Sequence, residues 1–576
     1  MRGVWRLITL LCAVSAVALV GTGNAEAQAR PNVVLVLTDD QRWDTLNVMP
    51  TVQSQLVDRG VTFENAFVVN PVCCPSRAST LTGRYSHSTG VYNNGGPFGG
   101  WGSFRPREAS TIATWLQEGG YRTGFFGKYL NNYGGPFVPP GWTRWVAFSP
   151  PNVENYYSYR LNVDGALVEY GSDAGDYSTD VLAGEASSFI RGAGPEPLFV
   201  LFAPFAPHGP PTPAPRHEGV FSGLPPWRPA SYNEPDAADK PAWVRALAPL
   251  TAEDGAAVDA FRRGQLESLL AVDDAVDELL DALADTGRLD ETLFVFTSDN
   301  GYLWGEHRWR TKIVPYEESI RVPFVVRYDG VAQAPATSSR LVANIDLAPT
   351  FAAAGGVAAP GAEGRSFLSL LPDPDAPWRP EVLVENRQSA TAPQVPSYCV
   401  VRNATHAYVQ YGTGEEEIYD VSADPGQLQN LARAPALRQQ LVTFRQRTRA
   451  LCNPPPPGMT LRSACLIAGN KHANRLRGTT AYDYICADAG ADRVEARSGD
   501  DVVYGGHGND LVYGEGGHDR IHGGLGLDRL YGGIGRDVVY AADGRRDVVG
   551  CGQGIDVAHA DRVDVVTACE TVRYGR

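Results

Sequence analysis

The segment "NPVCCPSRASTLTGRYSHS", from Asn70 to Ser88, places two adjacent cysteines before a proline, a serine and an arginine. The stretch "SRASTLTG" within it predicts the first turns of a helix. Cys73 would then lie at the positive end of that helix, where backbone N–H groups favour an anion. Four interpretations compete for Cys73 and Cys74: a disulfide, a zinc site, buried free thiols, or a reactive group.

These alternatives make different demands on the rest of the chain. Vicinal cysteines rarely bridge each other, because the ring they would close is strained. A zinc site needs further cysteines or histidines at close spacing, and none is nearby. A catalytic thiol needs a histidine partner, which the sequence does not exclude. The residues alone therefore leave buried thiols and a reactive group open.

The composition is that of a globular protein. The chain has 576 residues, 43% of them hydrophobic and 20% charged, which is enough for two or three domains. Its formal net charge of -15 argues against a nucleic-acid partner, because counterion release needs a basic face.

The N-terminus predicts an export signal over residues 1–29. Arg2 and Arg6 precede an apolar run from Leu7 to Val20, and "NAEAQA" then offers small residues in A-x-A spacing. The run is short for a membrane span, which takes about 20 residues, and no later stretch rivals it. We therefore expect a secreted, extracellular protein without a membrane span.

The cysteine count fits an oxidising compartment. Of nine cysteines, Cys12 leaves with the signal and eight remain. The pairs that suggest themselves are Cys399 with Cys452, Cys465 with Cys486, and Cys551 with Cys569, which leaves Cys73 and Cys74 unbridged.

The chain from Pro31 to about Leu451 alternates strand-like and helix-like segments, as α/β proteins do. The runs "NVVLVL", "LFVLFA" and "LFVFTS" are typical of buried parallel strands, and the segment before Gly287 has the spacing of a long helix. Apolar stretches shorten from about Glu381. We predict an α/β domain over 30–380, a smaller α+β sub-domain over 381–453, and a proline-rich linker leading into the next region over 454–480.

The region 481–576 is built on a nine-residue period. An aspartate recurs at Asp492, Asp501, Asp510, Asp519, Asp528 and Asp537, and an apolar residue follows each by two positions. A flexible glycine-rich linker has no reason to keep such a phase. The pattern G-G-x-G-x-D-x-U-x resembles the calcium-binding RTX-type β-roll repeat, which implies an all-β domain holding several Ca²⁺ ions.

A second resemblance resolves the cysteine pair. "CCPSRASTLTGR" fits, without a gap, the C-x-P-S-R-x-x-x-L-T-G-R signature of the type I sulfatases. This resemblance covers roughly Pro31 to Pro457 and implies an alkaline-phosphatase-like α/β fold. It also implies that Cys73 is converted to Cα-formylglycine by a formylglycine-generating enzyme, and that the aldehyde hydrate is the nucleophile. Cys74 fills a variable position and would be an inert buried thiol.

Metal ligands are expected at the ends of two strands. "LTDD" supplies Asp39 and Asp40, and "TSDNG" supplies Asp299 and Asn300, where open α/β sheets place their sites. Taken alone, such residues are more often loop caps or turns. Oxygen ligands favour calcium or magnesium over zinc. The resemblance matches these four residues to the family's metal ligands, with Cys73 beside them, and we expect one Ca²⁺ there.

The resemblance also assigns the catalytic cations. Arg77 matches the arginine that holds the nucleophile and the metal carboxylates, Lys128 the sulfate-binding lysine, and Lys312 the second lysine near the leaving group. His208 matches the histidine that acts as general acid. Each alone would more often be a surface charge or a structural histidine.

One position departs from the pattern. Many sulfatases have a histidine two residues after the first lysine, where this chain has Leu130. "GKYLN", "CCPSR", Tyr85 and His87 are instead similar to the branch of N-acetylglucosamine-6-sulfatase and the extracellular endosulfatases. Asn131 or Asn132 could contact the sulfate, and His87 would be structural.

The resemblance implies hydrolysis of an O-sulfate ester on a sulfated sugar such as 6-sulfated N-acetylglucosamine. Two alternatives remain. One is a phosphonate monoester or phosphodiester hydrolase of the same superfamily. The other is an inactive sulfatase-like adhesin carrying a calcium module.

Overall fold

A computed structural model describes residues 30–150 and 155–575. The export signal predicted for residues 1–29 lies outside the described residues. Within those two ranges, no helix combines the length and the apolar character needed to cross a membrane.

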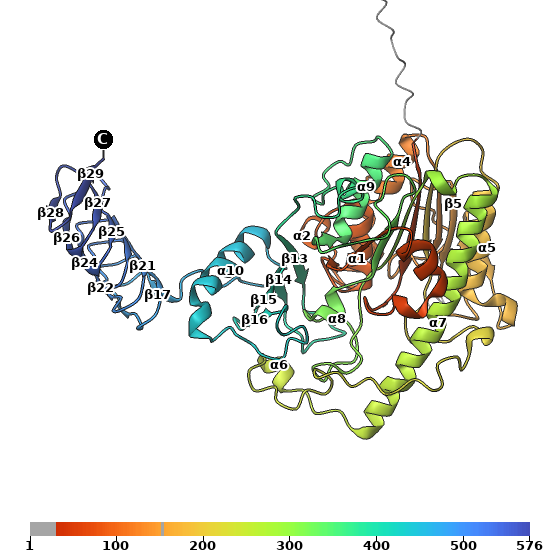
Figure 1. Cartoon of the computed structure of the whole chain (residues 1–576), viewed down its shortest axis with the longest axis horizontal. Helices are drawn as coiled ribbons and strands as arrows, with labels where there is room; N and C mark the ends of the chain where they lie inside the picture. Colours follow the sequence, from red (N-terminus) through yellow and green to blue (C-terminus); the bar gives the residue numbers. More distant parts are fainter. Residues whose placement is uncertain (1–29, 151–154, 576) are drawn as a thin grey trace, which may run out of the picture. The chain divides into compact units, whose positions relative to one another are not determined.

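A mixed β-sheet forms the centre of the first region (Figure 1). Among the described residues it has ten strands, in the order β11-β2-β10-β9-β1-β8-β4-β5-β6-β7. Their bounds are β1 Asn32–Thr38, β2 Val61–Phe63, β4 Arg122–Gly127, β5 Arg144–Phe148, β6 Arg160–Val163, β7 Ala166–Glu169, β8 Leu198–Ala203, β9 Thr292–Ser298, β10 Phe324–Arg327 and β11 Ala336–Ser338. Strands β9, β1, β8, β4 and β5 run parallel, as the continuous apolar runs predicted.

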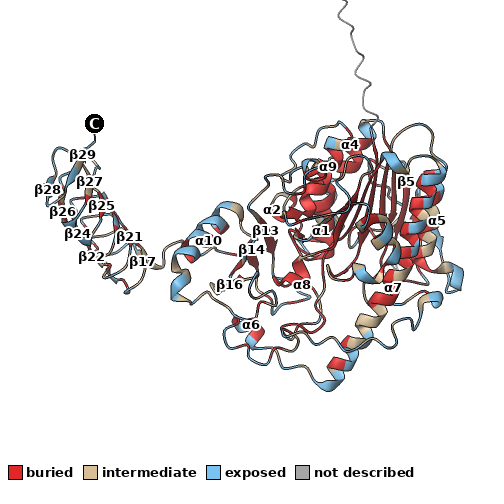
Figure 2. Cartoon of the chain, in the orientation of Figure 1, coloured by how far each residue is buried: buried red, intermediate tan, exposed pale blue. Residues whose placement is uncertain are grey.

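Helices cover both faces of this sheet, so its central strands are buried on both sides (Figure 2). One face packs against α1 (Cys73–Thr82), α4 (Ile112–Glu118) and α9 (Leu347–Ala354). The other packs against α5 (Ser178–Arg191) and α7 (Ala252–Asp285). Alternate residues of β1 enter the two cores, which explains why that strand is apolar throughout.

Shorter elements complete the loops around the sheet. They are α2 Ser86–Thr89, α3 Gly100–Phe104, α6 Ala242–Arg245, α8 Glu317–Ile320 and the paired strands β3 Ala66–Phe67 and β12 Val342–Ala343.

A small antiparallel sheet follows from Glu381. Its strands, in the order β13-β14-β15-β16, are β13 Glu381–Asn386, β14 Tyr398–Asn403, β15 His406–Tyr411 and β16 Glu416–Asp420, and the helix α10 (Arg438–Leu451) packs on it. The predicted disulfide between Cys399 and Cys452 ties β14 to the end of α10. Met459 lies buried with these cysteines, so the chain after Pro454 packs on the sub-domain and is not a free spacer.

The C-terminal region is a parallel β-roll of two sheets, with seven and six strands in the described residues. The strands are β17 Ile467–Asn470, β18 Arg475–Arg477, β19 Tyr484–Asp488, β20 Arg493–Glu495, β21 Val502–His507, β22 Leu511–Gly516, β23 Arg520–Leu525, β24 Arg529–Gly535, β25 Val538–Tyr540, β26 Val548–Gly554, β27 Val557–Ala560, β28 Val565–Thr567 and β29 Thr571–Tyr574. Strands β17 and β18 lie within 454–480, so the first coil begins at Ile467, earlier than the sequence suggested.

The nine-residue period explains the roll. Two repeats make one coil, and the apolar residue of each repeat enters a single narrow core; these residues are Val494, Val503, Val512, Ile521, Leu530 and Val539. The disulfides Cys465–Cys486 and Cys551–Cys569 form as predicted. Of the cysteines in the described part of the chain, Cys73 and Cys74 are free.

Candidate active site

Two neighbouring strands bring the acidic residues together. β1 and β9 are parallel, with Thr38 opposite Ser298, so the residues that follow each strand leave the sheet at the same edge. Asp40 has φ of 68°, a left-handed conformation that is uncommon for a residue other than glycine. This turn breaks the alternation of the strand and lets Asp39 and Asp40 face one site.

The second acidic loop closes on the first. The backbone N–H of Asp40 donates to Oδ1 of Asp299 at 3.3 Å, and Nδ2 of Asn300 donates to Oδ1 of Asp40 at 2.7 Å. Asp39, Asp299 and Asn300 are fully buried. The four residues that the sequence proposed as metal ligands therefore form one cluster.

Cys73 lies against this cluster as the first residue of α1. Its Sγ is 3.4 Å from Oδ1 of Asp39 and 2.7 Å from Nζ of Lys312. Cys74, the next residue, turns into the hydrophobic core between α1 and the sheet. The two thiols thus have different surroundings, and only Cys73 faces the polar site.

Three buried cations neutralise the carboxylates. Nε of Arg77 lies 2.6 Å from Oδ2 of Asp299, and Nζ of Lys128 lies 2.5 Å from Oδ2 of Asp39. Lys312 pairs with Oδ1 of Asp40. Arg77 also donates to the backbone carbonyl of Lys128 at 2.6 Å, which fixes the loop after β4.

Gly127 explains how Lys128 reaches the site. It has φ of 132°, and a Cβ built on it would lie 1.8 Å from the carbonyl oxygen of Ala203 on β8. Only glycine fits there. The tight approach of the two strands directs the following lysine towards Asp39.

His208 lies at the rim of the cluster. Its Nε2 is 3.6 Å from Oδ2 of Asp40, its Nδ1 is 2.8 Å from the carbonyl of Gly209, and its side chain is 21% exposed. Among the residues brought together here it is the one with marked access to solvent, as a proton donor to a substrate needs.

The electrostatics follow from burial and from these ion pairs. Burial alone would raise the pKa of Asp39, but Lys128, His208 and Arg77 together hold it well below its ordinary value. Burial and the charge of Asp39 raise the pKa of Asp299 to about 6. Burial raises the pKa of the Cys73 thiol well above its ordinary value and lowers the pKa of His208.

The residues present fit a divalent cation. Donor atoms of Asp39, Asp40, Cys73 and His208 all lie within 4.8 Å of one another. Oδ1 of Asn300 is buried and has no hydrogen-bond partner among the described residues, so one amide oxygen remains for a ligand. Several oxygens and no second thiol suit calcium or magnesium.

Leu130, at the position where many sulfatases have a histidine, is buried in the hydrophobic core and supplies no base. Asn132 is exposed, and its Nδ2 donates to the carbonyl of Asn94 at 3.0 Å. His87 bonds Glu385 at 2.9 Å and stacks on Tyr85, as expected of a structural histidine.

Arg42 and Glu306, which no sequence motif identified, lock the two acidic loops together. Arg42 donates to Oε1 of Glu306 at 2.8 Å and to the carbonyl of Tyr302 at 3.1 Å, so it ties the loop after β1 to the loop after β9. Arg42 and Glu306 are 264 positions apart, and no local pattern marks them.

The fold and the site together define an alkaline-phosphatase-like α/β protein with a buried cysteine beside a cluster of metal-ligand type. The sulfatase family profile matches residues 31–357, more than half of the chain, and the chain belongs to the sulfatase family. The C-terminal domain profile of N-sulphoglucosamine sulphohydrolase matches residues 305–453, and the RTX calcium-binding nonapeptide repeat matches three segments between 469 and 546.

Relatives and solved structures agree with this assignment. The chain is 36% identical to the extracellular sulfatase SULF-1 homolog of Drosophila melanogaster, over 60% of this chain and 32% of that protein. It is 35% identical to the N-acetylglucosamine-6-sulfatase of Capra hircus, over 72% of this chain and 82% of that protein. A protein solved in complex with its substrate D-glucosamine-2-N,6-O-disulfate shares the fold with a TM-score of 0.66 and 24% identity, over 74% of this chain and 99% of that one.

Proposed function

We propose that this protein is a secreted sulfatase that hydrolyses O-sulfate esters. The observation that carries the proposal is the position of Cys73, with its Sγ 3.4 Å from Asp39 and 2.7 Å from Lys312 at the meeting point of two acidic loops. A buried thiol has no structural need of such polar neighbours, whereas the precursor of an anion-binding nucleophile does.

We propose that a formylglycine-generating enzyme oxidises Cys73 to formylglycine. The hydrated aldehyde supplies two hydroxyls, one to displace the alcohol from sulfur and one whose deprotonation expels sulfate and regenerates the aldehyde. Arg77 holds the carboxylates around this group, and Lys128 and Lys312 place positive charge beside the sulfate oxygens.

His208 is the proposed general acid for the leaving alcohol. Its Nδ1–H donates to the carbonyl of Gly209, so Nε2 is the nitrogen that faces the cluster. Nε2 carries a transferable proton only in the imidazolium form, which burial disfavours and the charges of Asp40 and Asp39 favour. With Leu130 in the apolar core, the base of the elimination step must come from another group of the site.

The proposed metal is Ca²⁺, held by Asp39, Asp40, Asp299 and Asn300 together with the modified side chain at position 73. The bound ion supplies a positive charge that lowers the pKa of the nucleophile and binds sulfate oxygens. Arg77 and Lys128 orient the carboxylates for it through the contacts described above.

The proposed substrate is a sulfated sugar, with the 6-O-sulfate of N-acetylglucosamine as first choice. Support comes from the relatives, which include an N-acetylglucosamine-6-sulfatase. The named extracellular relative supports secretion.

The decisive experiment measures inorganic sulfate released from a panel of sulfated sugars and from an aryl sulfate. Hydrolysis of 6-sulfated N-acetylglucosamine supports the full proposal. Faster hydrolysis of an aryl phosphate diester than of the aryl sulfate would favour the phosphonate monoester hydrolase alternative. A persistent thiol at Cys73, found by mass spectrometry of the peptide ending at Arg77, would favour the inactive adhesin.

For the β-roll we propose bound Ca²⁺ along the aspartate columns. Each aspartate uses Oδ1 to accept a backbone N–H one coil away, as Asp510 does from Asp492 at 2.8 Å. The second oxygen, Oδ2, is buried and has no hydrogen-bond partner among the described residues; the aspartates concerned are Asp492, Asp501, Asp510, Asp519, Asp528, Asp537, Asp547 and Asp556. Buried carboxylate oxygens without donors favour a cation.

A further inference from the structure

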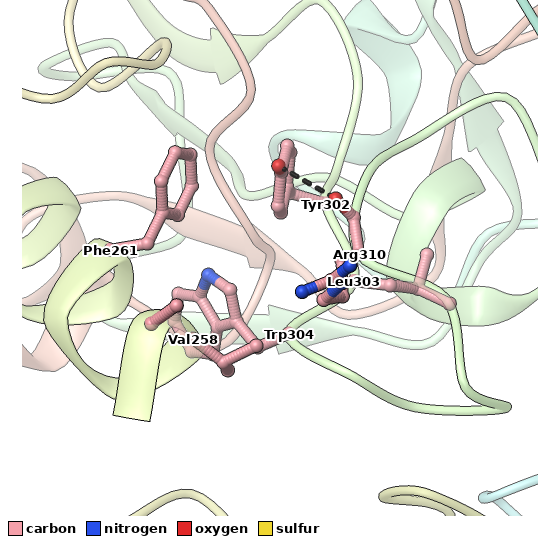
Figure 3. A pocket seen from close by; sticks show the side chains of 7 residues that line it. Val258, Phe261, Tyr302, Leu303, Trp304 and Arg310 are labelled. Carbon is pink, nitrogen blue, oxygen red and sulfur yellow. Dashed lines mark hydrogen bonds between the residues drawn. The ribbon is translucent and has the colours of Figure 1, made fainter. Parts of the chain in front are cut away.

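A pocket of about 280 Å³ lies between α7 and the loop that follows β9 (Figure 3). Its lining is mostly apolar and aromatic, and consists of Ala257, Val258, Phe261, Tyr302, Leu303, Trp304 and Arg310. Pockets for drug-sized ligands usually have about 300–1,000 Å³. This pocket therefore has the size of one ring with its substituents.

Two aromatic rings form a wall of this pocket. Phe261 and Tyr302 stack with their centroids 5.1 Å apart and an angle of 20° between the planes. Tyr302 is fixed by a hydrogen bond from its hydroxyl to the carbonyl of Arg310 at 2.9 Å, drawn as a dashed line in Figure 3. A rigid aromatic wall binds a flat, partly apolar ring at low entropic cost.

The pocket is next to the proposed reaction site. Tyr302 follows Asn300 by two residues, and a Cβ on Gly209, the neighbour of His208, would lie 2.6 Å from the ring of Phe261. Trp304 donates to Oε1 of Gln265 at 2.6 Å, and Gln265 donates to the carbonyl of Pro207 at 3.2 Å. The buried Gln265 thus connects Trp304 of the pocket to Pro207, which directly precedes the proposed general acid His208.

Arg310 is the charged group of the pocket. Its side chain is 47% exposed, and one guanidinium nitrogen bonds Oδ1 of Asp254 at 2.5 Å. A guanidinium has five N–H donors, so most remain for a second anion. Its planar donor geometry matches a sulfate or a carboxylate.

From these contacts we infer that the pocket binds the sugar ring on the alcohol side of the scissile ester, and that Arg310 recognises a second anionic group on that sugar or its neighbour. The inference rests on the proposed sulfatase function. Phe261 and Tyr302 contact the sugar ring. Arg310 discriminates between substrates that carry a second anionic group, a sulfate or a carboxylate, and substrates that do not.

The test measures equilibrium binding in a background that does not turn over, Cys73→Ala in the full chain. Two probes carry a second anionic group: glucosamine 2-N,6-O-disulfate, and a disaccharide in which a uronic acid is linked to 6-sulfated N-acetylglucosamine. The reference probe is N-acetylglucosamine 6-sulfate, whose only anionic group is the 6-sulfate. Adding Arg310→Ala should raise the Kd of a doubly anionic probe at least about tenfold relative to the N-acetyl probe. The probe affected, disulfate or uronate, identifies the anion.

Asp254→Asn is the matched control, because it removes the same ion pair and keeps the guanidinium. It should preserve the discrimination, and Arg310→Lys should restore part of it. Equal effects of Arg310→Ala on all three probes, or the same loss in Asp254→Asn, would overturn the inference. Binding of none of the sugars would do so too. A wild-type protein that binds them with this discrimination but releases no sulfate would instead refute the proposed function alone.

Discussion

At the scale of single residues, the adjacent cysteines show how one step along a helix separates two environments. Cys73 contacts Asp39 and Lys312, whereas Cys74 packs among apolar side chains, where burial raises the pKa of its thiol to about 12. A helix turns by about 100° per residue, so consecutive side chains necessarily point to different places.

Substitution should separate the two thiols. Cys73→Ala removes the precursor of the proposed nucleophile and should lower sulfate release at least about a thousandfold with an unchanged melting temperature. Cys74→Ala deletes one buried sulfur and should cost about 1 kcal/mol of stability while turnover persists. Sulfate release and thermal melting measure both; full activity of Cys73→Ala would refute the assigned nucleophile.

Glu318 is a buried carboxyl outside the acidic cluster. Burial and the charge of nearby Glu306 raise its pKa to about 8, and its Oε2 has no hydrogen-bond partner among the described residues. The folded state therefore binds a proton that the unfolded state has already lost between about pH 4.5 and pH 8, so stability falls as pH rises through this window.

Glu318→Gln should remove this loss and stabilise the protein on the order of 2 kcal/mol at pH 8. Melting temperatures recorded between about pH 5 and pH 9 test it, with the exposed Glu64→Gln as the control that leaves the profile unchanged. Equal stabilisation at both ends of the range would contradict the titration of Glu318.

At the scale of elements, the site depends on where strands end and on how closely they approach. Asp39, Lys128 and Asp299 directly follow the parallel strands β1, β4 and β9, so the ends of these strands place the three side chains in the site. The long helix α7 carries the pocket wall in its first turns and packs on the sheet with its later turns. It begins with a capping box between Thr251 and Asp254.

Gly127→Ala tests the approach of β4 to β8. The added methyl would meet the carbonyl of Ala203, so the strand end and Lys128 must shift. We expect at least about a hundredfold loss of kcat, since small displacements of catalytic groups are costly. Gly184→Ala on α5, where nothing lies within 4 Å of the new methyl, should keep activity and slightly raise the melting temperature. Normal turnover of Gly127→Ala would contradict the proposed role of the close contact.

At the scale of the whole molecule, two regions are stabilised by different means. The α/β region has large hydrophobic clusters on both faces of its sheet. The β-roll has one narrow core, two disulfides and columns of buried carboxylates. Its stability should therefore depend on cations far more than that of the α/β region.

Chelation by EGTA tests this difference. We expect the chain after about Leu461 to lose protection from protease while the α/β region keeps its melting transition. Added Ca²⁺ should restore the roll. Simultaneous melting of both regions would show that they are not independently stable.

Much of the fold follows from local patterns. The apolar runs at β1, β8 and β9, the spacing of α7 and the phase of the repeats predict those elements, because each depends on neighbouring residues. The roll begins at Ile467, before the predicted start at residue 481, because β17 and β18 lack the full repeat motif. The signature around Cys73 predicted, through resemblance, residues that the structure brings together.

The sequence by itself determined the long elements and the roll, because backbone propensity and hydrophobic periodicity act over short distances. The candidate site residues followed from the resemblance of the segment around Cys73 and of the strand-end motifs to the sulfatases. Only the tertiary structure decided that Asp40 and Asp299, 259 positions apart, meet in one cluster, that Arg42 locks their loops, and that Phe261, Tyr302 and Arg310 line one pocket. The physical reason is that strand order and close backbone approach set these contacts, and both depend on the packing of the complete sheet.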